Sequence, residues 1–154
     1  MKSRRKIIVH GTAVAVLGKD FAPSAVLLRG ASGRGKPDLS FRLIEAGGTL
    51  ICDDQVELEI RQEKIITAAA VEAIRGLMEV RGVGLLKFPV APPTQLRLIV
   101  DLVLREEVPR LPEWETEDIL GIPVVRLKLC AFDASAPLKI AKAIELVHKP
   151  GLLI

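Results

Sequence analysis

Aromatic side chains are scarce in this sequence of 154 residues, which has no Tyr, one Trp and four Phe. Proteins that bind single-stranded nucleic acid without sequence preference stack bases on aromatic rings, so this mode of binding is not expected here. The core must be mainly aliphatic. Because 49% of the residues are hydrophobic, the chain can bury a substantial core, and its length suits a single domain over residues 1–154.

A strong excess of either charge is also missing, since 22 basic and 19 acidic residues leave a net charge of +3. This balance does not indicate a nucleic-acid or membrane partner. No stretch approaches the roughly 20 apolar residues of a spanning helix. The apolar run after the basic MKSRRK is too short for a signal peptide. We expect a cytoplasmic protein.

Cysteine is rare as well, with Cys52 and Cys130 each inside an apolar run. We expect two buried free thiols rather than a disulfide.

The order of local patterns is strand, loop, helix and strand, followed by antiparallel pairs. Continuous apolar runs such as AVLLR indicate strands buried on both faces, while apolar spacing at 38–46 indicates a helix. Ser135 is expected to cap a last helix at 138–148, and 73–78 to form one helical turn. The other expected strands lie at 6–9, 12–16, 25–29, 49–52, 56–60, 64–69 and 95–104, with a hairpin turning near Gly121. This order predicts an α/β fold, a mixed sheet with packed helices.

The run GASGRGKPD resembles the phosphate-binding pattern G-x-x-x-x-G-K-[ST] up to its last position. A buried strand before it and a helix after it favour phosphate binding over an ordinary glycine turn. Backbone N–H groups and the helix amino terminus make an anion site, and Lys36 neutralises phosphate charge. The candidate nucleotide-binding residues are Gly30, Ala31, Ser32, Gly33, Arg34, Gly35, Lys36 and Pro37.

Pro37 stands where this pattern has Ser or Thr. Proline lacks the hydroxyl that binds Mg²⁺ in this loop class, and it lacks an N–H group. It fits the first turn of a helix, so we expect a loss of metal-assisted chemistry rather than of folding.

Two further runs carry candidate catalytic residues. Asp53 and Asp54 end a strand, where a carboxylate can hold Mg²⁺ or accept a proton; a solvated turn is the alternative. In EVRGVGLL, Glu79 and Arg81 share a face if the chain is extended, and suit a metal and a phosphate respectively; a salt-bridged pair before a glycine turn is the alternative. His10 precedes Gly11, and a lone histidine is more often structural. Arg126 suits either a phosphate or an exposed strand position.

Taken together, VHGTAV, VLLRGASGRGK, LICDDQVEL and EVRGVGLL resemble the catalytic domain of HPr kinase/phosphorylase, in the short form that consists of this domain. RLIVDLV, LGIPVVRLKL and FDASAPLKI continue the resemblance. It implies a P-loop fold related to phosphoenolpyruvate carboxykinase and a homo-oligomer, usually a hexamer. It also implies phosphate transfer from ATP, or from pyrophosphate in some members, to a serine of the phosphocarrier protein HPr, and often phosphorolysis.

The resemblance also assigns roles. It makes Asp53 the base for the serine proton, supported by Asp54, and places Glu79 on Mg²⁺. Arg81 joins the charged lining of the site, and His10 lies near the reacting phosphate. We therefore expect an ATP- and Mg²⁺-dependent serine kinase weakened by Pro37, with a non-catalytic nucleotide- or HPr-binding relative as the alternative.

Overall fold

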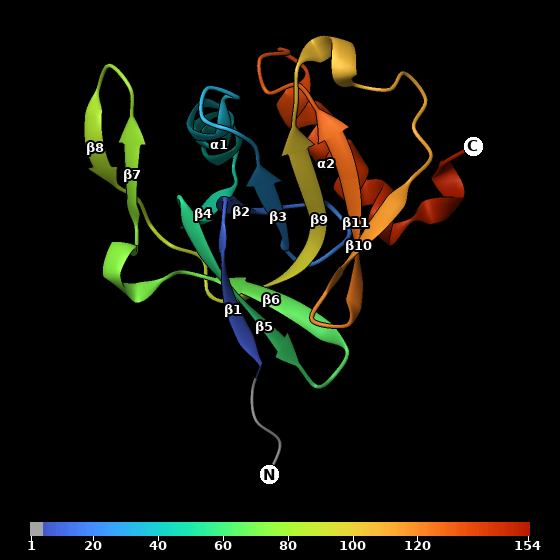
Figure 1. Cartoon of the computed structure of the whole chain (residues 1–154), viewed down its shortest axis with the longest axis horizontal. Helices are drawn as coiled ribbons and strands as arrows, with labels where there is room; N and C mark the ends of the chain where they lie inside the picture. The colour runs from blue at the N-terminus through green and yellow to red at the C-terminus, as the bar shows by residue number, and fades with distance from the viewer. Residues whose placement is uncertain (1–4) are drawn as a thin grey trace.

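Nine strands form one continuous mixed sheet in the computed structural model, which describes residues 5–154 (Figure 1). Its order is β1-β5-β6-β9-β3-β2-β4, and β9 also pairs with β11, which pairs with β10. The strands are β1 (Lys6–His10), β2 (Thr12–Val16), β3 (Ser24–Arg29), β4 (Thr49–Cys52), β5 (Gln55–Arg61), β6 (Ile65–Ala69), β9 (Thr94–Leu102), β10 (Glu115–Ile119) and β11 (Ile122–Leu129). The predicted α/β class and mixed sheet are confirmed.

Four strands in the part of the sheet from β4 to β11 point the same way. Strands β3, β9 and β11 pair in parallel. Strand β2 is antiparallel to both β3 and β4, so β4 runs in the same direction as β3. The carboxyl ends of β4, β3, β9 and β11 therefore lie along one edge, which is where ligands bind in open α/β sheets.

The two faces of the sheet are covered differently. Helices α1 (Lys36–Glu45) and α2 (Ala136–His148) pack on one face, burying Leu39, Leu43, Ile140 and Ile144 against β2, β3 and β9. On the other face, strands β5 and β6 turn over the sheet (Figure 1). A second core cluster of buried residues, separate from the one beneath the helices, lies between these strands and the sheet. Strand β3 lies between the two clusters, which explains its uninterrupted apolar sequence.

Strands β7 (Leu77–Val80) and β8 (Gly84–Lys87) form a separate hairpin beside α1 (Figure 1). Met78 and Val80 are buried with Leu50 of β4, and Phe41 of α1 packs against them. A short 3-10 helix, η1 (Glu72–Ile74), precedes the hairpin. The prediction of one helical turn over 73–78 is therefore confirmed only at its start, since 75–76 form a turn and Leu77 and Met78 belong to β7.

The ends of the helices are set by local geometry. Helix α1 begins at Lys36 with Pro37 in its first turn, as expected. Ser135 precedes α2, but its side chain makes no capping hydrogen bond, because its backbone is helical (φ −82°, ψ −2°) rather than extended. The expected serine cap is thus wrong. Two more 3-10 helices, η2 (Arg105–Glu107) and η3 (Pro150–Leu152), complete the elements.

Cys52 and Cys130 are buried and free, as predicted. Within residues 5–154, no helix is both long enough and apolar enough to cross a membrane.

Candidate active site

The glycine-rich loop connects β3 directly to α1. Gly33 and Gly35 have φ of 85° and 90°, in the left-handed region that glycine adopts without strain. The carbonyl of Gly35 accepts a 2.9 Å hydrogen bond from the N–H of Leu39, so the helix grows out of the loop. Ala31, Ser32 and Gly33 are exposed. The loop therefore presents its backbone to solvent at the amino terminus of a ten-residue helix.

Lys36 folds back over this loop. Its Nζ donates a hydrogen bond to the carbonyl oxygen of Gly30, the first glycine of the run. The nearest hydroxyl on α1, that of Ser40, donates to the Lys36 carbonyl at 2.7 Å. Because Ser40 is buried and committed to the helix backbone, it does not replace the hydroxyl that Pro37 removes.

Asp53 lies at the same edge, just beyond β4. Its Oδ1 accepts a 2.7 Å hydrogen bond from Oγ1 of Thr12, a fully buried residue at the start of β2. Burial raises the pKa of Asp53, while the Thr12 bond and the positive charge of Lys36 lower it in part. Lys36 thus connects the loop electrostatically to the first candidate carboxylate.

Asp54 and His10 lie beside Asp53 and are more exposed. His10 Nδ1 is 3.6 Å from Asp54 Oδ1, and the two side chains are 69% and 72% exposed. The N–H of Gly11 donates to the Asp54 carbonyl at 3.0 Å. Strand β4 ends at Cys52, so both aspartates lie beyond the strand, and its alternation of faces does not set the direction of their side chains. The positive φ of Asp54, 68°, sets its direction instead.

Glu79 and Arg81 come from the hairpin that flanks α1. Glu79 lies on β7 opposite Leu85, whereas Arg81 lies outside the strand, in the turn. The expectation that the two share a strand face is therefore wrong. Both are exposed, and in residues 5–154 no ion pair or hydrogen bond joins them to each other, to the loop or to the aspartates.

Metal-binding side chains are sparse. In the part of the chain that the structure describes, no group of three or more His, Cys, Asp or Glu residues could hold a metal ion. The residues therefore do not form a protein cage for Mg²⁺. They fit only an ion that arrives on substrate phosphates and takes one or two carboxylates, which is the usual way in which proteins bind Mg²⁺.

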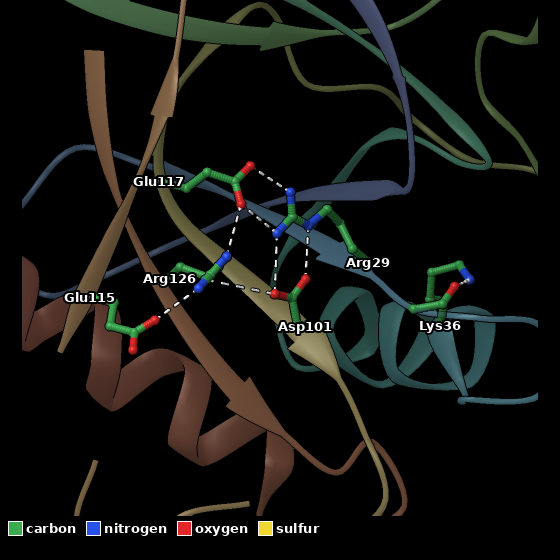
Figure 2. A network of polar contacts seen from close by, with 7 residues as sticks. Arg29, Lys36, Asp101, Glu115, Glu117 and Arg126 are labelled. Carbon is green, nitrogen blue, oxygen red and sulfur yellow. Dashed lines mark hydrogen bonds and ion pairs between the residues drawn. The ribbon is translucent and has the colours of Figure 1, made fainter. Parts of the chain in front are cut away.

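An ion-pair network at the end of β3 was not predicted (Figure 2). Arg29 donates to both oxygens of Asp101 at 2.8 and 3.1 Å, and to both oxygens of Glu117 at 2.7 and 2.8 Å. Arg126 bonds Glu117 at 3.2 Å and Glu115 at 2.8 Å. Both arginines are thus paired with carboxylates.

The network was missed because it depends on strand register. Arg29 and Asp101 are direct partners across the β3–β9 pairing, although they lie 72 residues apart in the sequence. Thr12 escaped notice for the same reason, since it is 41 residues from Asp53. Only their positions at strand ends could have signalled either pair.

The fold and the edge just described define an α/β protein with a glycine-rich strand-to-helix loop beside carboxylates. Residues 2–146 match the family model described as HPr Serine kinase C-terminal domain. The chain belongs to this family, as its resemblance indicated.

Curated relatives agree with this assignment. An HPr kinase/phosphorylase of Leptothrix cholodnii is 39% identical over 143 residues, covering 85% of this chain and 42% of that protein. One from Acidovorax sp. is 37% identical over 131 residues, covering 77% of this chain and 40% of the relative. The chain therefore spans about 40% of the length of the curated relatives it matches.

A solved structure shows the same fold. The HPr(Ser) kinase/phosphatase from Coxiella burnetii matches with a TM-score of 0.78 at 24% sequence identity. The match covers 95% of this chain and 92% of the other.

Proposed function

We propose that the chain is a catalytic domain that transfers a phosphoryl group from ATP to a serine of an HPr-like phosphocarrier protein, and that it can run the reverse phosphorolysis. One observation carries this proposal. The glycine loop with Lys36 and the half-buried carboxylate of Asp53 lie on one edge of the sheet, close enough for the charge of Lys36 to affect the pKa of Asp53. The family membership supports it.

In this proposal the loop residues Gly30–Lys36 bind the nucleotide phosphates through backbone N–H groups and the Lys36 ammonium. Asp53 accepts the proton of the attacking serine hydroxyl, or in reverse activates inorganic phosphate. Its raised pKa makes it a stronger base than an exposed aspartate. Thr12 orients the acceptor oxygen by donating to Oδ1 at 2.7 Å. Catalysis consists mainly of positioning and charge neutralisation.

The remaining site residues have supporting roles. Asp54 and His10 border Asp53 on its solvent side, with 3.6 Å between their side chains. Mg²⁺ would neutralise phosphate charge when bound with the nucleotide, and Glu79 would share it. Arg81 would line the site. We further propose, from the family resemblance, a single catalytic domain with a P-loop fold related to phosphoenolpyruvate carboxykinase, assembled as a homo-oligomer such as a hexamer.

A second candidate function is a non-catalytic relative that binds nucleotide or HPr and regulates through binding. Pro37 favours it, because the loop lacks both the metal-binding hydroxyl and one backbone donor, and Ser40 does not compensate. The presence of Lys36, Asp53 and Glu79 argues against it, because a site without chemistry would not need them.

The deciding experiment measures phosphate transfer from ATP to HPr with Mg²⁺, for this chain and for Pro37→Ser side by side. We expect Pro37→Ser to be faster, because it regains a metal ligand. Equal activity in both proteins would show that the hydroxyl is dispensable. Silence in both would reject the kinase and leave the binding function.

A further inference from the structure

The segment between β11 and α2 borders the glycine loop from the side opposite the aspartates. A Cβ placed on Gly35 would lie 2.9 Å from the Ala131 Cβ and 3.1 Å from Cε1 of Phe132. The ring of Phe132 thus lies directly against the last glycine of the loop. It is 60% exposed, whereas the other three Phe residues are partly buried. In a chain with so few aromatic residues, an exposed ring at this position needs an explanation.

The backbone beneath this ring is held firmly. Arg42 of α1 donates to the carbonyl oxygens of Ala131 and Asp133. Arg105 Nε donates to the Asp133 carboxylate at 2.6 Å. These contacts tie the segment both to the helix that follows the loop and to η2. The ring is therefore exposed on a fixed backbone, which reduces the entropy cost of binding a partner.

The strand order places Phe132 and Asp53 on opposite sides of the loop. From β4 to β11 the order is β4-β2-β3-β9-β11, and the loop follows the central β3. Asp53 follows β4 and Phe132 comes shortly after β11. A phosphate chain that lies in the loop with its reacting end toward Asp53 extends its other end toward Phe132. In a nucleoside triphosphate, that other end carries the ribose and base.

We propose that Phe132 is the stacking platform for the nucleobase of the phosphate donor. This inference rests on the proposed function, since it requires phosphates in the loop. The face of an aromatic ring accepts any base, so the platform serves ATP and GTP alike. It adds affinity for nucleoside triphosphates and none for donors without a base. Phe132 thereby determines how far the site prefers nucleotides over inorganic polyphosphates.

The test is titration calorimetry with ATP and with inorganic tripolyphosphate, both with Mg²⁺, on the parent chain, Phe132→Ala and Phe132→Trp. We expect Phe132→Ala to weaken ATP binding about tenfold and to leave tripolyphosphate binding unchanged. Phe132→Trp should keep ATP affinity, and its fluorescence should be quenched by ATP and not by tripolyphosphate. Leu138→Ala, which removes a 74% exposed side chain from the first turns of α2, is the matched control and should change neither affinity.

The outcomes separate this inference from the proposed function. If Phe132→Ala weakens both ligands equally, the ring only supports the loop, and the inference fails while the phosphate site stands. If it weakens neither, the inference also fails. If the parent chain binds neither ligand, the phosphate site itself is wrong and the inference falls with it.

Discussion

The side chain of Asp53 lies half-buried between the Thr12 hydroxyl and the charge of Lys36. Burial disfavours its ionised form more than these two partners favour it, so the net effect is a raised pKa. Such a carboxylate is costly to the fold at neutral pH and useful as a proton acceptor. Titratable groups perturbed in this way concentrate at functional sites.

This cost gives a prediction for Asp53→Asn. The native chain holds the Asp53 proton to higher pH than the unfolded chain, whose carboxyl titrates near 3.8. Stability is therefore lost as pH rises above 3.8 and through the raised pKa of Asp53. Thermal unfolding should show Asp53→Asn to be more stable than the parent chain at pH 7, with the difference shrinking as pH falls toward 3.8.

Asp54→Asn is the control, because its side chain is 72% exposed and should change the melting temperature little. A pH-independent difference between Asp53→Asn and the parent chain would refute the burial argument for Asp53.

At the scale of elements, one ion-pair network connects the strands beside the loop. Arg29 at the end of β3 holds Asp101 of β9 and Glu117 of β10, and Arg126 of β11 shares Glu117 (Figure 2). Lys36 lies apart from these residues, on the far side of Arg29 (Figure 2). The network therefore connects the strand that carries the loop to β9, β10 and β11.

We predict that Arg29→Met destabilises the chain by about 2 kcal/mol, measured by urea unfolding. This is below the cost of breaking a fully buried pair, because the Arg29 side chain is 27% exposed and solvent screens the charges in part. Met keeps the apolar stem but leaves Asp101 and Glu117 without their main partner. Lys142→Met, which breaks an exposed pair with Glu145 on α2, should change little. Equal stability of the two variants would contradict a structural role for the network.

At the scale of the whole molecule, the sequence predicted the elements whose signals are local. The apolar run of β3, the glycines after it and Pro37 in the first turn of α1 were all foreseen, and so was the mixed sheet. The β7–β8 hairpin was not. In β7, buried Met78 and Val80 alternate with exposed Leu77 and Glu79. This alternation identifies a half-buried strand only when it is known that α1 covers one side of the hairpin. Long-range pairs such as Thr12 with Asp53 depend on register, which no single segment encodes.

The same distinction applies to the candidate site. The loop and the aspartates were candidates from the sequence, and the fold brings them to one edge. The roles of Glu79 and Arg81 depend on how the hairpin packs beside α1, and they remain predictions, as do the roles of the loop and of the aspartates.

The central claim is that the loop and Asp53 act together in phosphoryl transfer. The most direct test compares Pro37→Ser with Pro37→Ser/Asp53→Asn, measuring ATP affinity and the rate of phosphate transfer from ATP to HPr. We predict that the double variant binds ATP as tightly as Pro37→Ser and transfers phosphate roughly 100-fold more slowly or worse, because a positioned general base contributes at least that factor. A double variant that transfers phosphate as fast as Pro37→Ser would contradict the account.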